Sequence, residues 1–370
     1  MNKKVLAIGP HSPPITGPGL KNRYLCEGLT ERGFDIQWIN TLETSPKTIA
    51  RILRETMTYD AYILSASTKV RLFVAPVLAT KLRSPDVYGA LFPAGGEFAN
   101  ELDALPSYVR EFYIRTFSSF NGIYPEADEL TADLQEIFGN RTHIRTVPNF
   151  RPLPASTPVG SERHTDNSQT LELVYVGRIK ESKGLDDLLD AFERTKTKDV
   201  DVSLDIYGHF LPDDPYEAHF RKKCAKISGA DFNGKIPDGG VIQTLQNYDS
   251  FVFPTFYDGE GIPGALIEAF AAGCPIVATD WNYNGEMITD GVDGRLYEPR
   301  NVDELASHIE WLARHPAERE EMQRNAYETA KKYSIEEVTE TILTYLTESG
   351  WASSAANTDV QTLDRSHSRV

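Results

Sequence analysis

The chain has 370 residues, which corresponds to about two or three domains of ordinary size. Hydrophobic residues make up 40% and charged residues 25%, and these ordinary globular values exclude a disordered chain, a collagen-like repeat and a disulfide framework. Lys and Arg number 38 against 54 for Asp and Glu, so the net charge of -16 opposes a general nucleic-acid-binding surface, which must be basic.

The cysteines and the N-terminus indicate the compartment. Cys26, Cys224 and Cys274 lie far apart and are odd in number, which favours a reducing environment and gives no metal-ligand spacing. The apolar run after the N-terminal lysines is too short for a signal peptide, and no run approaches the ~20 apolar residues of a membrane span. We expect a cytoplasmic protein, for which a peripheral contact with the inner face of a membrane stays open.

The first part of the chain alternates short β-rich runs with helical patterns, which is typical of βαβ units and a parallel sheet. We predict strands at 5–9, 34–40, 61–67, 87–92 and 122–124. Helices are predicted to end near Gly33 and to cover 51–57, 108–117 and 127–139. These elements form an N-terminal Rossmann-like domain over 1–152, on the acceptor side.

A second alternation follows a Pro-, Ser- and Thr-rich linker predicted at 153–170. Strands are expected at 171–177, 200–208, 250–256 and 275–280, and helices at 184–195, 216–227, 263–272, 302–315 and 318–333. The C-terminal domain over 171–333 then ends in a helix at 334–349 that packs back toward the N-terminal domain, and in a mobile tail at 350–370. The expected fold is α/β, with two Rossmann-like domains that face a central cleft where ligands bind.

The first chemical signal follows the strand at 171–177. Arg178 and Lys183 stand on a short loop between that strand and the next helix. Such a loop can aim both cations at a bound diphosphate and offset charge on a leaving group. The alternative is that both are solvated loop residues.

The second signal is the segment FYDGEGIPGALIEAFAAG at 256–273. Pro263 suits the first turn of a helix, so Glu260 precedes the helix and Glu268 lies inside it, eight positions later. The glycines near Pro263 leave backbone amides uncovered at the helix N-terminus, which is an anion site. The carboxylates suit sugar and ribose hydroxyls, which donate hydrogen bonds. The alternative is a surface Glu and a turn residue.

Together these two signals resemble the retaining glycosyltransferases of family 4, which belong to glycosyl transferases group 1 and have the GT-B fold. The resemblance extends to about Leu346. Supporting motifs follow in order: TVPNF, DIYG, FNGKIPD, YDSFVFPTFYDGEG and NGEMITDGVDGRLYEP.

The resemblance implies a role for each matching residue. Arg178 and Lys183 would hold the donor diphosphate, Glu260 would contact the transferred sugar, and Glu268 would bind the ribose hydroxyls. Further binding residues are implied at Lys235 and Ile236 beside the nucleobase, and at Gly261, Ile262, Pro263 and Gly264 beside the phosphates. No metal and no cofactor beyond the nucleotide sugar are expected, since the cations and the helix end take the part of a divalent ion.

The N-terminal domain matches the family less closely. Gly17 and Gly19 stand in the position of the family's Gly-rich loop, although a plain surface turn is the alternative. Where many relatives carry a His near the sugar, this chain has LFPAGGEFANEL, so the role of the 95–97 loop is in doubt, and His11 is a candidate substitute. The aromatic stretch 108–120 either packs on the sheet or faces a lipid-linked acceptor.

The implied function is a retaining, hexosyltransferase-like enzyme of polysaccharide biosynthesis, with a nucleotide diphosphate sugar as donor. The acceptor is a hydroxyl of a glycan, a glycolipid or a polysaccharide precursor. Two alternatives stay open, namely a nucleotide-sugar epimerase of the same fold and a non-catalytic partner that binds the nucleotide sugar. An epimerase needs an acid/base pair, for which the sequence offers only His11 and Glu97.

Overall fold

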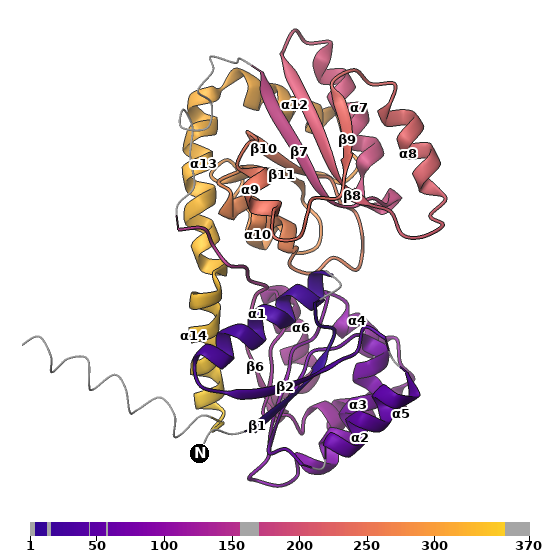
Figure 1. Ribbon diagram of the computed structural model, residues 1–370, viewed down its shortest axis with the longest axis vertical. Helices are drawn as coiled ribbons and strands as arrows, with labels where there is room; N and C mark the ends of the chain where they lie inside the picture. The colour runs from indigo at the N-terminus through magenta and orange to yellow at the C-terminus, as the bar shows by residue number, and fades with distance from the viewer. Residues whose placement is uncertain (1–3, 13–15, 44, 57, 156–169, 352–370) are drawn as a thin grey trace, which may run out of the picture. The chain divides into compact units, whose positions relative to one another are not determined.

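The computed structural model describes residues 4–12, 16–43, 45–56, 58–155 and 170–351. The chain divides into two compact units, residues 1–150 with 335–370 and residues 151–334. Each unit holds, among its described residues, one parallel six-stranded sheet with helices around it (Figure 1). The predicted α/β class with two Rossmann-like sheets is therefore confirmed. Most of the predicted linker and almost all of the predicted tail lie outside the described residues.

The sheet of the first unit has the strand order β2-β1-β3-β4-β5-β6. Its strands are β1 (Lys4–Gly9), β2 (Asp35–Asn40), β3 (Ala61–Leu64), β4 (Tyr88–Leu91), β5 (Gly122–Ile123) and β6 (His143–Ile144). β1 and β3 are almost entirely buried apolar runs, as expected for strands covered on both faces.

Seven α-helices of the described residues belong to this unit: α1 (Gly17–Glu31), α2 (Pro46–Glu55), α3 (Thr68–Lys81), α4 (Phe98–Asp103), α5 (Ser107–Phe117), α6 (Asp128–Phe138) and α14 (Ile335–Glu348). The Thr16 side chain caps α1, and Gly139 ends α6 with a φ of 56°. Neither α3 nor α4 is predicted from the sequence pattern, because Pro76 interrupts the first and the second has only 6 residues.

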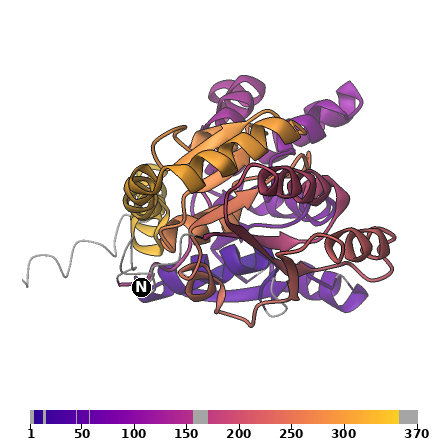
Figure 2. The same ribbon diagram turned by 90° about the horizontal axis from the view of Figure 1, so that it is seen from above.

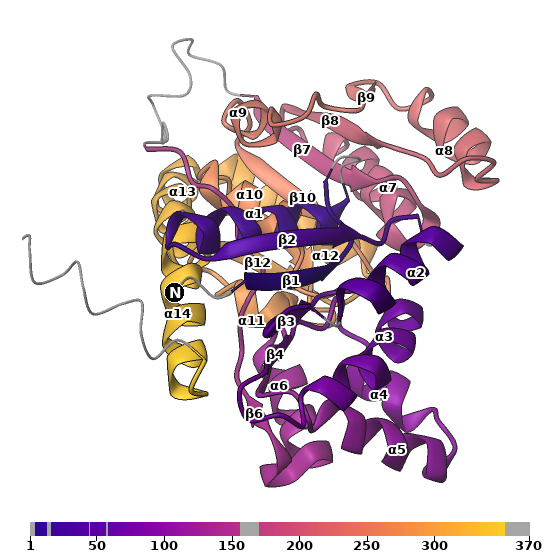
Figure 3. The same cartoon turned by 60° about the horizontal axis from the view of Figure 1, so that its bottom comes forward.

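The helix that follows the second unit packs in the first one. α14 lies beside α1, as Figure 3 shows. Val338, Ile342 and Leu346 of α14 are buried in the same apolar core as Leu25 and Leu29 of α1. The chain thus returns to the first unit through a helix that completes its core.

The sheet of the second unit has the order β12-β11-β10-β7-β8-β9. Its strands are β7 (Leu171–Arg178), β8 (Val202–His209), β9 (Ala230–Gly234), β10 (Ser250–Phe253), β11 (Ile276–Thr279) and β12 (Gly294–Tyr297). The helices are α7 (Leu185–Lys196), α8 (Tyr216–Cys224), α9 (Val241–Leu245), α10 (Gly264–Ala271), α11 (Asn284–Met287), α12 (Val302–Arg314) and α13 (Pro316–Ala330), with short 3-10 turns at Glu181–Lys183 and Lys331–Tyr333. α7 packs against α12 (Figure 2).

The strand order of this sheet reverses between β7 and β10, which are neighbours. Connections from two such strands leave in opposite directions, so the loops at their carboxyl ends diverge and make room for a ligand. The loop after β7 carries Lys183, and the loop after β10 carries Glu260. The fold therefore brings both sequence signals to one edge of one sheet.

Candidate functional site

The loops after β7 and β10 are in direct contact. The Phe256 amide donates a hydrogen bond of 2.9 Å to the Ser182 carbonyl. Gly184 has a φ of 71°, and a Cβ there would lie 1.9 Å from the Pro254 carbonyl oxygen. Only glycine meets both conditions, so Gly184 permits the close approach of the two loops.

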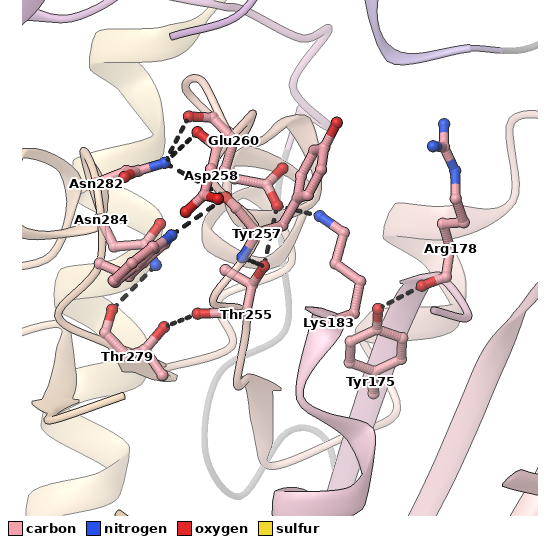
Figure 4. Close-up of polar contacts among 11 residues, drawn as sticks. Tyr175, Arg178, Lys183, Thr255, Tyr257, Asp258, Glu260, Thr279, Asn282 and Asn284 are labelled. Atoms are coloured by element: carbon pink, nitrogen blue, oxygen red, sulfur yellow. Dashed lines mark hydrogen bonds and ion pairs between the residues drawn. The ribbon is translucent and has the colours of Figure 1, made fainter. Parts of the chain in front are cut away.

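Lys183 and Glu260 form the central ion pair of this edge. The Lys183 Nζ contacts Glu260 Oε2, and the same oxygen accepts a hydrogen bond of 3.2 Å from Thr255 Oγ1. Figure 4 shows the two side chains pointing toward one another. Their exposed fractions are only 12% and 15%, and burial lowers the pKa of Lys183 although Glu260 opposes that shift. Two residues given separate roles by the sequence are thus partners.

Arg178 does not converge with Lys183. It is the exposed last residue of β7, and its side chain extends away from the Lys183–Glu260 pair (Figure 4). The Tyr175 hydroxyl donates a hydrogen bond of 2.9 Å to the Arg178 carbonyl. The expectation that both cations aim at one point is therefore not met in this structure, where Arg178 lies toward β8.

Arg178, His209 and Lys235 follow one another along the carboxyl ends of β7, β8 and β9. Arg178 pairs in register with His209, the last residue of β8. Burial and the nearby charges of Arg178 and Lys235 lower the pKa of the His209 imidazole. Lys235 is exposed and lies 3.5 Å from Asp238, whereas Ile236 is buried. The sequence reading missed His209, whose only signal was its place at the end of a strand.

A second missed group holds the loop that carries Glu260. Asn282 follows β11, and its Nδ2 donates to the carbonyls of Tyr257 at 3.4 Å, Asp258 at 3.0 Å and Glu260 at 3.2 Å. Trp281 Nε1 also donates to the Tyr257 carbonyl, at 3.1 Å. Figure 4 shows how these bonds gather the loop. The backbone before Glu260 is therefore fixed from β11.

The helix α10 begins where the sequence places it, one residue after Pro263. Its N-cap residue Pro263 makes no side-chain capping bond, so backbone amides of the first turn have no side-chain acceptor from the cap. The preceding residues Gly261, Ile262 and Pro263 and the first helical residue Gly264 lead directly from Glu260 into this turn. The helix N-terminus lies beside the ion pair and favours an anion there.

Glu268, inside α10, is paired with a residue that no motif suggested. Arg151 Nε donates to Glu268 Oε1 at 2.9 Å, and the two side chains are 4% and 15% exposed. The Arg151 guanidinium also packs against Gly264, where a Cβ would lie 1.7 Å from Nη2. Gly264 thus leaves the space that this guanidinium occupies.

The predicted residues of the N-terminal domain lie in the first unit. The Gly19 amide donates to Thr16 Oγ1 at 3.1 Å, so Gly19 serves the cap of α1, while Gly17 is exposed. His11 Nδ1 lies 2.7 Å from the Ser12 carbonyl. In the 95–97 loop, Gly95 has a φ of 81° and Glu97 is the exposed N-cap of α4.

The carboxyl edge of the first sheet also holds a buried ion pair between Lys21 and Glu126, at 2.6 Å. Within the described ranges, no group of three or more His, Cys, Asp or Glu side chains is arranged to hold a metal ion. No described helix is both long enough and apolar enough to span a bilayer.

Comparison with known proteins agrees with this fold and site. Residues 160–329 match the family model "Glycosyl transferases group 1", so this segment is a domain of that group. The chain is 29% identical over 190 residues to the glycogen synthase of Mycobacterium tuberculosis, a match that covers 51% of this chain and 44% of the relative. It is 26% identical over 252 residues to a putative colanic acid biosynthesis glycosyltransferase, WcaL, of Salmonella typhimurium, covering 65% and 59%. The chain thus spans about half the length of these curated relatives.

Solved structures agree in fold. HepE of Anabaena, in complex with UDP-glucose, has a TM-score of 0.72 and 15% identity over 94% of this chain and 100% of that chain. A TarM variant of S. aureus, in complex with UDP and two acceptor-like sugars, has a TM-score of 0.62 and 20% identity over 80% and 58%. Both likenesses support the two-domain α/β fold.

The contact of Gly264 with Arg151 predicts a conditional loss of stability. Gly264→Ala should lower the free energy of unfolding by about 1–3 kcal/mol, because the new Cβ overlaps the guanidinium. In an Arg151→Ala background the same change should cost nothing, since Ala favours a helix over Gly. Urea unfolding of the four proteins measures the difference, and an equal cost in both backgrounds would contradict the contact.

The place of His209 predicts a shift in its titration. Arg178→Gln should raise the pKa of the His209 imidazole, since it removes one of the charges that lower it. NMR titration measures this pKa, with His209→Gln to assign the resonance. Because the unfolded chain takes up this proton more readily, His209 also lowers stability as pH falls through the usual histidine range. An unchanged pKa in Arg178→Gln would separate the two side chains.

Proposed function

We propose that this chain transfers a sugar from a nucleotide diphosphate sugar to a hydroxyl acceptor and retains the configuration of the anomeric carbon, as a glycosyltransferase of family 4. The observation that carries the proposal is the buried Lys183–Glu260 pair, which lies at the strand-order reversal and directly before the N-terminus of α10. A cation, a carboxylate and a helix N-terminus then meet at one point inside the segment 160–329.

The donor would be held by groups of different chemistry. The diphosphate is placed at the first turn of α10, where backbone amides from Gly261 to Gly264 donate to it and Lys183 supplies charge. Glu268 accepts hydrogen bonds from the ribose hydroxyls, and Glu260 accepts them from the transferred sugar. Lys235 and Ile236 flank the nucleobase, and Arg178 reaches the diphosphate from the end of β7.

Binding of the donor would rearrange the central pair. Lys183 contacts Glu260 in this structure. An anionic diphosphate gives Lys183 a stronger partner, and this releases Glu260 Oε2 to accept a sugar hydroxyl. Because burial lowers the pKa of Lys183, the dianion also restores the charged form of the amine. The pair therefore keeps both side chains neutralised until the donor arrives.

In the proposed reaction, the acceptor oxygen attacks the anomeric carbon on the face from which the diphosphate leaves. The transition state resembles an oxocarbenium ion, and an oxygen of the leaving β-phosphate takes the acceptor proton. Lys183 and Arg178 act on charge that develops as the glycosidic bond breaks, which is the kind of stabilisation that speeds a reaction. We propose that this chemistry requires neither a metal ion nor a further cofactor.

The relatives favour a donor and an acceptor class. HepE was solved with UDP-glucose, and TarM with UDP and α-GlcNAc-glycerol. Several curated relatives, such as the colanic acid and poly(glycerol-phosphate) transferases, act on surface polysaccharides or polyol phosphates by name. We propose a nucleotide sugar as donor, and a glycan or a lipid-linked precursor in polysaccharide biosynthesis as acceptor. Incubation with donor alone distinguishes an epimerase, which yields a new nucleotide sugar.

A peripheral membrane contact in the cytoplasm is the second part of the proposal. The residues Phe73, Tyr108 and Phe112 are 50%, 80% and 53% exposed on α3 and α5, and these two helices pack together. Figure 3 shows both helices on the same side of the first unit. Aromatic side chains exposed on neighbouring helices fit the interfacial layer of a bilayer, where a lipid-linked acceptor lies.

Removing the central cation should reduce turnover. Lys183→Ala is expected to lower kcat by about 10²- to 10³-fold, as for the loss of one group that stabilises developing charge. Lys331→Ala, which removes an exposed lysine paired with Glu328, is the matched control and should keep full activity. Product release from nucleotide sugars measures kcat, with and without EDTA. Full turnover of the Lys183→Ala variant would remove this residue from the mechanism, and loss of wild-type turnover in EDTA would contradict metal independence.

Removing the exposed aromatics should weaken membrane binding and leave the chemistry intact. Phe73→Ser with Phe112→Ser is expected to lower partition into phosphatidylglycerol vesicles more than about tenfold, since each buried aromatic ring contributes about 1.5–3 kcal/mol. Val292→Ser, at a residue 45% exposed in the second unit, is the control. Co-sedimentation measures partition. Unchanged partition of the double variant would exclude this surface as the contact.

A further inference from the structure

The pairing of Arg151 with Glu268 deepens the proposed function, on which this inference rests. Glu268 is half-buried on α10, and its Oε1 accepts the Arg151 Nε hydrogen bond at 2.9 Å. Among the described residues, no partner of Glu268 Oε2 is found. A carboxylate that is held at one oxygen keeps the other as an acceptor in a fixed direction.

The charge of Arg151 also answers an electrostatic problem. The proposed site brings a diphosphate to the first turn of α10, on the same helix that carries Glu268. Two negative groups so close, with little solvent between them, repel each other or force the carboxylate to take up a proton. The Arg151 guanidinium lies at both places, because it bonds to Glu268 and packs against Gly264 in that first turn. It therefore offsets the carboxylate where the diphosphate is to bind.

The backbone of Arg151 is fixed independently of its side chain. The Arg151 amide donates a hydrogen bond of 2.9 Å to the Tyr333 carbonyl, and Arg151 forms a parallel β-bridge with Ser334. Arg151 and Ser334 are also the first and last residues of the second unit. The guanidinium thus extends from a backbone that two passes of the chain hold together, and it reaches α10 with only 4% of its side chain exposed.

We propose that Arg151 is a positioning residue for the ribose of the nucleotide: it fixes Glu268 through Oε1, so that Oε2 accepts a ribose hydroxyl beside the diphosphate. Its role is specific to the ribose, because the hydrogen bond it orients goes to a sugar hydroxyl. A residue that only supports the packing of α10 would affect all nucleotides alike. This difference separates a positioning role from a structural one.

The test compares ribonucleotides with their deoxy forms. Wild-type protein is titrated by calorimetry with UDP, GDP and ADP, and the tightest is repeated as its 2′-deoxy and 3′-deoxy analogues. One deoxy form should bind about 10- to 100-fold more weakly, since it lacks a hydrogen bond to a charged group. Both members of a pair carry the same diphosphate, so a general loss of affinity cancels in the ratio of their dissociation constants.

Arg151→Gln should lower this ratio to less than about threefold, and Glu268→Gln should do the same, with no further fall when the two are combined. Arg324→Gln removes an exposed arginine paired with Glu320 and should keep the wild-type ratio. Arg151→Lys keeps the charge without the planar fork and should give an intermediate ratio, which preserves the test if Arg151→Gln does not fold. Thermal unfolding of each variant checks the fold.

The outcomes distinguish two failures. If the wild type binds none of the three nucleotides, the proposed function fails and this inference fails with it. If the wild type prefers the ribonucleotide and both Arg151 variants keep that preference, the proposed function stands and Arg151 only packs against α10. A preference lost in Glu268→Gln but kept in Arg151→Gln would likewise overturn the positioning role.

Discussion

The N-terminus of α10 depends on charge compensation, and the rest of the second unit is arranged around it. Two carboxylates, Glu260 and Glu268, lie just before and within this helix, and each is paired with a mostly buried cation. Without Lys183 and Arg151, the helix end would present two buried negative groups at the place where its own dipole attracts an anion. The two ion pairs make that end of the sheet stable and still able to receive a phosphate.

Close approach is the condition for both pairs, and two glycines provide it. Gly184 lets the loop after β7 meet the loop after β10, and Gly264 leaves room for the Arg151 guanidinium. From the other side, Asn282 binds three successive carbonyl groups of the loop that carries Glu260. The geometry of the site therefore comes from backbone contacts among three loops at one edge of the sheet, while the strands set only its position.

The local parts of this arrangement could be predicted from the sequence. The helix at 263–272 was expected from Pro263 and Gly273, and it is found at Gly264–Ala271. The strand at 171–177 was expected from its apolar run, and it is found at Leu171–Arg178. Both depend on neighbours in the sequence, for which patterns are informative. The Arg151–Glu268 pair joins residues 117 positions apart and leaves no local pattern, so it could not be found in this way. The separation of Arg178 from Lys183 was missed because spacing along a loop does not fix the direction of a side chain.

The central claim is that a nucleoside diphosphate binds between the loops after β7 and β10. A crystal structure of the chain with the most tightly bound of UDP, GDP and ADP tests it most directly. The account predicts the diphosphate at the first turn of α10, with Lys183 Nζ moved from Glu260 to a phosphate oxygen and Glu268 still held by Arg151. A nucleotide bound elsewhere, with the Lys183–Glu260 pair intact, would contradict it.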